Sequence, residues 1–326
     1  MSYITKAATF ALFLHFVASF ELNSQKFDIS TDTRIISSGP SMVTTKAKSG
    51  FECAIVCTND DNCCSCSYNE DSEQCQLSCS CSPTTELHNG SFTFIKTPQP
   101  VFSVPVTDCS ELPAGTKSGV YCIQPDFEAP EIAVYCEMDI DDGGWTTIQR
   151  RYDGTVDFYR FWEDYKFGFG DIAGEHWLGN ENLMFIVRQG SYQVRFDLED
   201  FTGDTSYAVY DTIDVGDESL NYSLLLVGYS DGTAGNAMAD LNPKWNHMFT
   251  TRDRDNDLSS EFNCGIKKES GWWHTACTSA NINGGYGEMY NNTANMHWKT
   301  WKTNALKKTR MMIKPMEASS GITGIG

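Results

Sequence analysis

The stretch that decides the fold is Asp142-Gly-Gly-Trp-Thr-Thr-Ile-Gln-Arg-Arg151, followed directly by Tyr-Asp-Gly154. It reads as a glycine turn, a short strand of aromatic and β-branched residues, and a second glycine turn. Similar short runs bounded by Gly, Asp or Asn recur on both sides, at 132–135, 192–196 and 223–227. In this part of the chain one helix is expected, near 158–167. This pattern predicts an α+β domain rich in loops and short antiparallel strands.

The overall composition excludes several classes of partner. The 326 residues include 24 Lys and Arg against 43 Asp and Glu, which gives a net charge of −19. An acidic chain is repelled by nucleic acid and by anionic lipid, so we expect neither as a partner. Aromatic residues make up 13% and charged residues only 21%. That is too apolar for a disordered chain, so most of the sequence should fold.

The N-terminus has the three parts of a secretory signal peptide. Lys6 supplies a positive charge, an apolar run follows from Ala7 to Val17, and the small residues Ala18 and Ser19 come next. The run is shorter than the roughly 20 residues that a membrane-spanning helix needs. We predict a signal peptide over 1–19, a secreted, extracellular protein and no membrane-embedded segment. Disulfides are then the expected state of most cysteines.

The thirteen cysteines divide the chain into two parts. Eight lie between Cys53 and Cys81, and five lie at 109, 122, 136, 264 and 277. Three prolines, at 98, 100 and 105, favour an extended spacer between the groups. We predict a disulfide-rich domain over 24–97, a linker over 98–107, a larger domain over 108–316 and a disordered tail over 317–326. Three sequons agree with a secreted glycoprotein, and their asparagines are Asn89, Asn221 and Asn291.

The smaller domain begins with a helix signal. Ser49-Gly-Phe-Glu52 is a capping box, and Cys53 and Cys57 lie one helical turn apart, where they can attach the helix to neighbouring strands. A domain of this size gains from disulfides worth about 2–4 kcal/mol each. A zinc cluster is the alternative, although paired C-x-x-C motifs are absent. The cysteine spacing, with the closing Phe92-Thr-Phe-Ile-Lys96, resembles the PAN/apple module, which implies a non-catalytic domain that binds proteins or carbohydrates.

Many segments of the larger domain follow one another in a recognisable order. The most specific are Asp108-Cys-Ser-Glu-Leu112, Asp142–Arg151, Gly174-Glu-His-Trp-Leu-Gly-Asn180, Gly271-Trp-Trp273 and Met312-Ile-Lys-Pro315. Together they resemble the fibrinogen C-terminal domain of ficolins, tachylectins, angiopoietins and tenascins, over 108–316. The resemblance implies two disulfides, Cys109–Cys136 and Cys264–Cys277. Cys122 is then left over, as a buried thiol, as a partner of the first domain, or as the link in a homo-oligomer.

An acidic run, Asp253-Arg-Asp-Asn-Asp257, places three carboxylates at alternating positions with no apolar residue between them. Such spacing can surround one Ca²⁺, which takes about six to eight oxygen ligands. The resemblance implies a more definite set, with the side chains of Asp255 and Asp257 and the carbonyls of Ser259 and Glu261. The loop that follows is one residue longer than in the ficolin-like pattern, so the second carbonyl stays open. A solvated acidic turn is the alternative.

Lectins of this family bind acetyl groups beside the calcium, so the resemblance also implies a ligand pocket around the Ala276–Cys277 peptide bond. The residues expected to line it are His274, Ala276, Cys277, Thr278, Tyr286, Tyr290 and Trp298. Two departures alter the pocket, because Thr278 replaces the usual His and Lys268 stands where an aromatic residue is common. Trp272, Trp273 and Trp298 are better explained as core side chains. Acetyl binding and a different ligand both remain open.

Two further motifs need an interpretation. Gly228-Tyr-Ser-Asp-Gly232 matches the G-x-S-x-G nucleophile motif, but the following residues predict a loop where the motif needs a helix, so we predict no enzyme. A basic stretch near the C-terminus is either a solvated face or a docking surface for acidic glycans or a protein. It consists of Lys299, Lys302, Lys307, Lys308, Arg310 and Lys314.

These features together favour a secreted, calcium-dependent, lectin-like protein that binds acetylated or related glycans in innate immunity. The alternative is an extracellular protein-binding ligand or a matrix and adhesion component without sugar binding, as the angiopoietin and tenascin branches suggest.

Overall fold

The computed structural model describes residues 17–22, 25–35, 43–60, 63–79, 85–97, 106–125, 131–239, 247–277, 279–288, 294–302 and 304–316. Most of the predicted signal peptide and linker, and the whole tail over 317–326, lie outside these residues. So do Cys81, Thr278, Tyr290 and Asn291. In the part of the chain that is described, no helix is long and apolar enough to cross a membrane.

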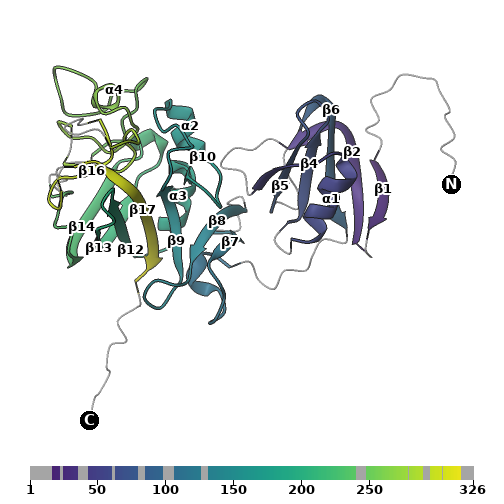
Figure 1. Ribbon diagram of the computed structural model, residues 1–326, viewed down its shortest axis with the longest axis horizontal. Coiled ribbons are helices and arrows are strands. Elements are labelled where there is room, and N and C mark those ends of the chain that lie inside the picture. Colours follow the sequence, from purple (N-terminus) through teal and green to yellow (C-terminus); the bar gives the residue numbers. More distant parts are fainter. Residues whose placement is uncertain are drawn as a thin grey trace, which may run out of the picture. The chain divides into compact units, whose positions relative to one another are not determined.

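The chain divides into two compact units. The first is a six-stranded sheet in the order β1-β2-β6-β4-β5-β3, with helix α1 packed against β4 (Figure 1). Its elements are β1 (Val17–Leu22), β2 (Gln25–Ile35), β3 (Val43–Lys46), α1 (Gly50–Thr58), β4 (Ser65–Asn69), β5 (Gln74–Ser78) and β6 (Thr85–Thr97). Strand β1 includes Ser19, so the predicted cleavage point falls within a strand.

Helix α1 begins where its capping box predicts. The Ser49 hydroxyl accepts a hydrogen bond from the Glu52 amide at 3.2 Å, while the Glu52 carboxylate accepts from the Lys48 amide at 2.6 Å. Disulfides join Cys53 of α1 to Cys75 of β5, and Cys57 to Cys63.

Cys66 corrects the expectation that all eight N-terminal cysteines serve as cross-links. It is a thiol, buried within β4. Burial raises its pKa to about 12, an effect that Lys96 only partly opposes. Because the thiolate is the reactive form, this cysteine is chemically inert at neutral pH. The sequence leaves Cys122 as the one cysteine without a predicted disulfide, and Cys66 is a second cysteine outside a disulfide.

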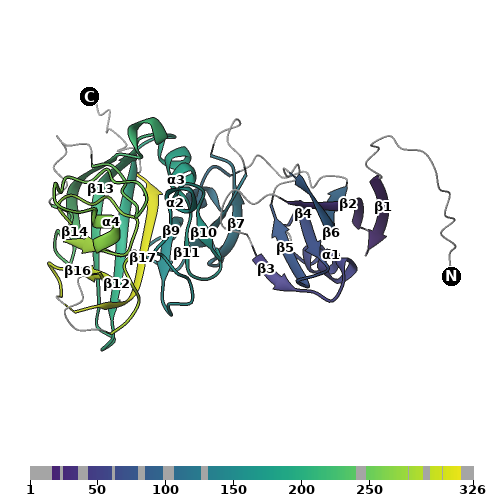
Figure 2. The same cartoon turned by 90° about the horizontal axis from the view of Figure 1, so that it is seen from above.

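The second unit is built on one sheet in the order β10-β11-β9-β17-β12-β13-β14, extended from β9 by β8 and β7. The C-terminal strand β17 inserts between β9 and β12, which precede it by more than a hundred residues (Figure 2). The strands are β7 (Gly119–Ile123), β8 (Ile132–Glu137), β9 (Trp145–Arg151), β10 (Phe169–Gly170), β11 (His176–Trp177), β12 (Tyr192–Asp200), β13 (Thr205–Val215), β14 (Leu224–Gly232) and β17 (Leu306–Pro315). A separate pair is β15 (Ala280–Asn281) with β16 (His297–Trp298). The predicted α+β class is confirmed.

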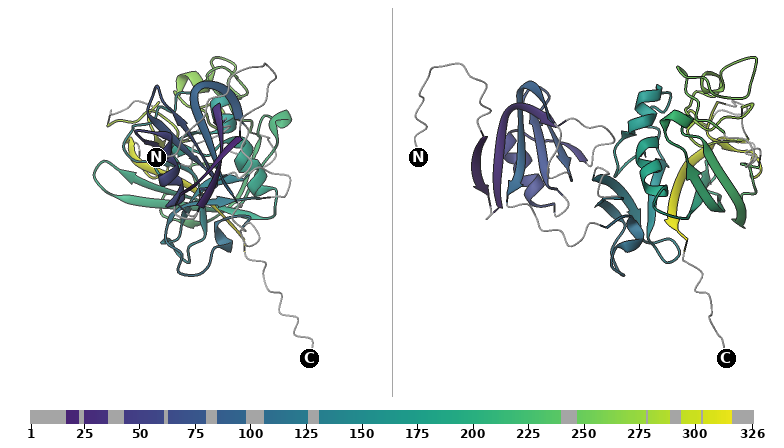
Figure 3. Two further views of the ribbon diagram at one scale, coloured as in Figure 1. Left: turned by 90° about the vertical axis from the view of Figure 1, so that its right-hand side faces the viewer. Right: turned by 180° about the vertical axis from the view of Figure 1, so that it is seen from behind.

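Few helices accompany these strands: α2 (Trp162–Phe167), α3 (Asn180–Val187), α4 (Cys264–Lys267) and the short turns η1 (Cys109–Glu111) and η2 (Glu218–Leu220). The predicted helix near 158–167 is present but begins only at Trp162. Its first turn is capped from within the helix, because the Asp164 carboxylate accepts a hydrogen bond from the Phe161 amide at 3.2 Å. Figure 3 shows α3 lying along the sheet, and its buried side chains pack toward β13.

Strand β12 shows how the sheet separates core from solvent. Its buried and half-buried residues alternate strictly, with Val194, Phe196 and Leu198 in the core. The residues between them, Arg195 and Asp197 among others, therefore face the opposite side. This polar outer face carries the groove described below.

The core of the second unit contains many aromatic residues. Trp177, Trp272, Trp273 and Trp298 are completely buried, and the first three contact one another at ring centroid distances between 5.1 and 6.5 Å. The packing role predicted for Trp272, Trp273 and Trp298 is thus confirmed.

Candidate functional site

The acidic loop is tied together by its own carboxylates. Asp253 serves the fold, since its Oδ1 accepts hydrogen bonds from the Trp162 amide at 2.9 Å and the Thr251 hydroxyl at 2.7 Å. Asp257 holds the loop closed, accepting from the amides of Ser259 at 2.7 Å and Cys264 at 2.6 Å. The loop is anchored to the rest of the domain through the Cys264–Cys277 disulfide.

Asp255 and Asp257 form the centre of the predicted calcium site. Asp255 Oδ1 accepts a hydrogen bond from the Asp257 amide at 3.3 Å, so the Asp255 carboxylate lies against the backbone of Asp257. The pKa of Asp257 is raised, first by burial and then by the negative charge of Asp255, although two backbone hydrogen bonds oppose the shift. Two hard carboxylates held this close fit a divalent cation.

The remaining calcium ligands would have to be neutral. Among the described residues, no group of three or more His, Cys, Asp or Glu side chains is arranged so that it could hold a metal ion. Ser259 is half-buried and Glu261 is exposed, and both belong to the irregular loop before α4. Their carbonyls are of the right chemical type, and the calcium assignment remains a prediction.

The residues expected to form an acetyl pocket are mostly engaged in packing. His274 is 1% exposed, and Trp298 donates its indole N–H to the Gly235 carbonyl at 3.0 Å. Tyr286 donates its hydroxyl to the Tyr152 carbonyl at 3.1 Å and packs edge-on against Phe201. Ala276 is exposed and Cys277 is in a disulfide, whereas Thr278 and Tyr290 lie outside the described residues.

Lys268 makes the surroundings of His274 basic. The lysine is 4% exposed, and burial, followed by the charges of Lys299 and Lys267, lowers its pKa to about 8. Burial also lowers the pKa of His274 to about 3, with a smaller contribution from Lys268. A buried amine therefore lies close to a neutral histidine, which makes this part of the domain polar and basic.

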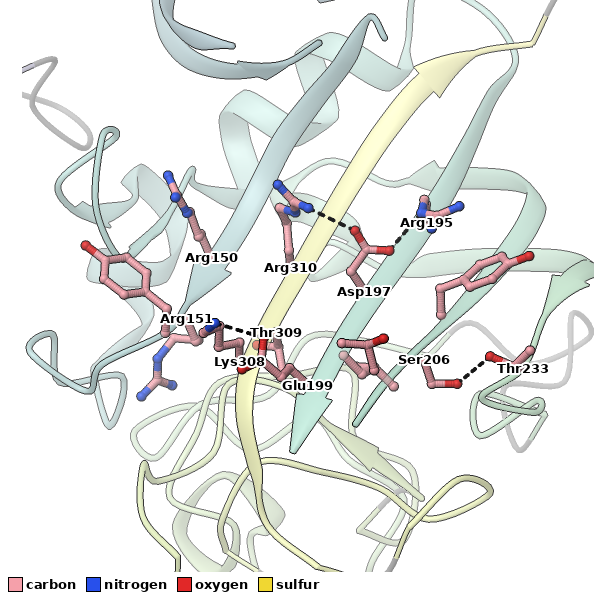
Figure 4. Close-up of a pocket in the computed structure, with 14 residues that line it drawn as sticks. Arg150, Arg151, Arg195, Asp197, Glu199, Ser206, Thr233, Lys308, Thr309 and Arg310 are labelled. Atoms are coloured by element: carbon pink, nitrogen blue, oxygen red, sulfur yellow. Dashed lines mark hydrogen bonds and ion pairs between the residues drawn. The ribbon is translucent and has the colours of Figure 1, made fainter. Parts of the chain in front are cut away.

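A groove of about 730 Å³ crosses the outer face of the sheet, over β9, β17, β12 and β13 (Figure 4). Such a volume lies within the range of ligand pockets, about 300–1,000 Å³. Five cations and two acids line it together with hydroxyl and aromatic groups. They are Arg150, Arg151, Arg195, Lys308, Arg310, Asp197, Glu199, Tyr152, Thr205, Ser206, Tyr207, Thr233, Thr309 and Leu198.

Three members of the predicted basic stretch are neutralised by acids. Lys302 pairs with Asp200 and Asp204. Lys308 pairs with Glu199 at 2.8 Å, and Arg310 pairs with Glu137 and Asp197. Half of the stretch is therefore part of a partly exposed surface of paired charges. The sequence could not show this, because the acids come from other strands.

The other predicted positions are placed as follows. Disulfides join Cys109 to Cys136 and Cys264 to Cys277, the pairs implied by the resemblance. Cys122 is half-buried on β7, opposite Ala133 of β8.

The two described sequon asparagines differ in their surroundings. Asn89 is exposed, while the Asn221 side chain accepts a hydrogen bond from Arg254 at 2.7 Å and contacts Met248. The motif Gly228–Gly232 lies inside β14 and is followed by turns, not by a helix.

Sequence reasoning overlooked three exposed apolar side chains beside the acidic loop. Leu258 is 58%, Phe262 is 37% and Ile266 is 53% exposed. The ammonium of Lys267 lies 3.4 Å from the Phe262 ring centroid. The available signal was a set of large apolar residues within a segment otherwise made of acids and turn residues.

Comparison with known proteins shows which family the larger unit resembles. The family described as fibrinogen beta and gamma chains, C-terminal globular domain, matches residues 106–316. Human fibroleukin is 41% identical over 234 residues, which cover 67% of this chain and 53% of fibroleukin. Bovine angiopoietin-2 is 39% identical over 246 residues, which cover 71% of this chain and 49% of angiopoietin-2. The chain spans about half the length of these curated relatives.

Solved structures agree with this match. The fibrinogen-like globe domain of human ANGPTL2 superposes with a TM-score of 0.61 and 38% identity, covering 65% of this chain and 99% of that domain. Lamprey fibrin D-dimer, complexed with the peptide ligand Gly-His-Arg-Pro-amide, gives a TM-score of 0.60 and 34% identity, covering 69% of this chain and 79% of the other. This chain therefore belongs to the fibrinogen C-terminal domain family.

Proposed function

We propose that the protein is a secreted, non-enzymatic ligand that binds another extracellular protein through the apolar rim of its acidic loop. The rim consists of Leu258, Phe262 and Ile266. The observation that carries the proposal is the exposure of these three large side chains within nine residues of sequence.

The rim has the composition of a protein interface. Exposed apolar patches bordered by polar groups mark binding surfaces, and aromatic residues are enriched in them. Hydrogen bonds hold the loop in shape, since the Leu258 amide donates to the Thr275 carbonyl at 2.9 Å and the Cys264 amide donates to Asp257. A preorganised loop loses little entropy when it binds.

The relatives support a protein partner over a glycan. The named ones are fibroleukin and angiopoietins, and the lamprey relative holds a peptide. An acetyl-binding lectin with an innate immune role is the alternative. It is weakened by the burial of His274 and Trp298 and by the buried charge at Lys268.

The rim can be tested by screening the full chain against a library of extracellular domains. Each of Leu258→Ser, Phe262→Ser and Ile266→Ser should weaken binding to a captured domain by about tenfold, because core interface residues cost more than about 1 kcal/mol when truncated. The matched control is Leu220→Ser, which alters an equally exposed apolar residue of η2. Calcium-dependent retention on N-acetylglucosamine resin, eluted by acetate and indifferent to these changes, would favour the lectin instead.

We further propose that Ca²⁺ binds to the acidic loop through the carboxylates of Asp255 and Asp257, with the carbonyls of Ser259 and Glu261 completing the protein ligands. The ion would neutralise two adjacent negative charges and fix the loop that presents the rim. The fit rests on the close approach of the two aspartates and on the uniformly oxygen-based donors.

Calcium should raise the stability of the domain by about 2.7 kcal/mol at a hundredfold excess over its dissociation constant. Asp255→Asn should abolish this gain and, without calcium, leave stability equal to or above that of the wild type, because it relieves repulsion between like charges. Thermal unfolding with calcium and with chelator measures both effects, and Asp142→Asn serves as an exposed control. An identical calcium response in Asp255→Asn and the wild type would refute the assignment.

The N-terminal unit is proposed to be a PAN/apple-like binding module. Its helix attached by a disulfide to an adjacent sheet supports this assignment. Export through the predicted signal peptide is supported by the disulfides of both units, which form in oxidising compartments. A covalent dimer through Cys122 stays a prediction.

A further inference from the structure

Arg150 in the sheet groove differs from the other cations that line it. Arg151 pairs with Glu175, Arg195 with Asp197 and Asp141, Lys308 with Glu199, and Arg310 with Glu137 and Asp197. The described residues offer Arg150 no carboxylate. Its guanidinium donates one hydrogen bond, to the Ala173 carbonyl at 3.2 Å.

The position of Arg150 in the sheet places it beside a cation that already has its anions. Arg150 of β9 is directly opposite Arg310 of β17 in the antiparallel register, and Figure 4 shows the two side chains next to each other. The charge of Arg310 is compensated by Glu137 and Asp197, whereas Arg150 pairs with no carboxylate of the described residues. An anionic group placed at Arg150 would give it the kind of partner that the neighbouring arginine already has.

Aromatic rings give the Arg150 guanidinium a defined setting. Its central carbon lies 4.7 Å from the ring centroid of Tyr135 and 5.3 Å from that of Tyr152. Such contacts orient a planar guanidinium, which can then bind a carboxylate through two parallel hydrogen bonds. Several of its N–H groups remain available for this purpose.

The rest of the groove suits a short stretch of polypeptide. The groove crosses four strands, and three gaps of about 4.8 Å make roughly 14 Å, which about four extended residues span. Its far side offers hydroxyls on β13, including Ser206, which is bonded to Thr233 at 2.7 Å, and Tyr207. These are suitable partners for peptide carbonyl and amide groups.

We propose that this groove binds an acidic peptide segment of a protein partner, with one Asp or Glu side chain of that segment on Arg150. A polyanion such as a sulfated glycan fits less well, because Asp197 and Glu199 lie in the same groove and would repel its further charges. This surface is separate from the apolar rim, so each can be tested without the other.

The test uses the full chain and an array of five-residue peptides that each contain a single Glu, beside an otherwise identical array with Gln. The chain should retain a subset of the Glu peptides and bind their Gln counterparts about tenfold less tightly or worse, since a charge-assisted hydrogen-bond pair is lost. Arg150→Gln should cause a similar loss for the same peptides. Arg150→Lys should fall between, because it keeps the charge without the planar fork.

Lys314→Gln is the matched control, since it removes one positive charge from β17 outside the groove. It should change binding by no more than about twofold. Unchanged unfolding temperatures would show that the variants are folded. Equal retention of Glu and Gln peptides, equal binding by Arg150→Gln and the wild type, or Arg150-dependent retention of a heparin oligosaccharide without any peptide would each overturn the proposal. Phe262→Ser should leave peptide retention unchanged.

Discussion

Glu175→Gln should lower the free energy of unfolding of the fibrinogen-like domain by about 4 kcal/mol, a large share of the roughly 5–15 kcal/mol that holds a domain together. Glu175 is 1% exposed. Its carboxylate is the common acceptor for the loop that follows β9, and no other single carboxylate of the described residues accepts as many backbone hydrogen bonds in the structure.

The geometry explains the size of the effect. Glu175 Oε1 accepts from the amides of Tyr152, Asp153 and Gly154 at 2.7, 3.0 and 2.9 Å, and Oε2 accepts from Val156 at 3.0 Å. Burial by itself would raise the pKa of Glu175, but these four hydrogen bonds reverse the shift and lower it. A glutamine would turn an N–H₂ group toward some of these donors and leave them unsatisfied.

Arg151 adds to the cost of the substitution. Its Nε lies 3.6 Å from Glu175 Oε1, and its guanidinium is buried above the Phe158 ring at 3.9 Å. Removing one member of a buried ion pair leaves the other charge without a partner, which costs about 3–5 kcal/mol. The double variant Arg151→Met/Glu175→Gln should therefore lose less stability than the two single variants added together.

Urea unfolding followed by tryptophan fluorescence measures this loss in the fibrinogen-like domain alone, because all eight tryptophans lie after residue 144. Glu163→Gln makes the same change of charge at an exposed position of α2 and should stay within about 0.5 kcal/mol of the wild type. A Glu175→Gln protein as stable as the Glu163→Gln control would show that the carboxylate does not hold the loop.

Acidification from pH 7 to pH 5 should destabilise the same domain by about 4 kcal/mol through two buried histidines. Burial lowers the pKa of His176 to about 4 and that of His274 to about 3. In the unfolded chain a histidine has a pKa near 6.5, so below this pH the unfolded state binds a proton that the folded state does not bind. Above pH 6.5 each histidine is mostly neutral in both states and hardly affects stability. At pH 5 the proton taken up by the unfolded state lowers the free energy of unfolding by about 2 kcal/mol for each histidine.

The pH dependence can be assigned residue by residue. His176→Asn and His274→Asn should each reduce the slope of unfolding free energy between pH 5 and pH 6 by about 1.4 kcal/mol per pH unit, the value for one proton. The interval stays above the ordinary carboxylate range, so Glu175 does not contribute. Equal slopes in the wild type and both variants would mean that these histidines are protonated in the folded state.

Much of the fold could be predicted from local sequence. The runs at 145–148 and 192–196 became β9 and β12, and the capping box at Ser49 correctly marked the start of α1. These signals are local, because a strand or a helix cap is specified by neighbouring residues. The helix near 158–167 was placed too early, since Asp164 caps it from within and fixes its start at Trp162.

The candidate site was less predictable. The acidic run was visible in the sequence, but only the structure shows what each aspartate contacts. The Asp253 carboxylate accepts a hydrogen bond from the Trp162 amide, whereas the Asp255 carboxylate accepts one from the Asp257 amide. The expected acetyl pocket depended on side chains being exposed, and His274 and Trp298 proved to be buried. Exposure is a property of the packed chain, so no residue type reveals it in advance.

By itself, the sequence determined the α+β class, the fibrinogen-like family and most strand positions, because turn residues and short hydrophobic runs act through near neighbours. Only the tertiary structure decided what the charged residues do. It inserted β17 between β9 and β12, and it paired cations of β17 with acids from other strands. It placed Arg150 opposite Arg310, and of these two arginines only Arg150 has no carboxylate partner among the described residues. It also brought Glu175 to the amides of 152–156. Electrostatic roles follow from distances in space, and the order of residues along the chain does not contain those distances.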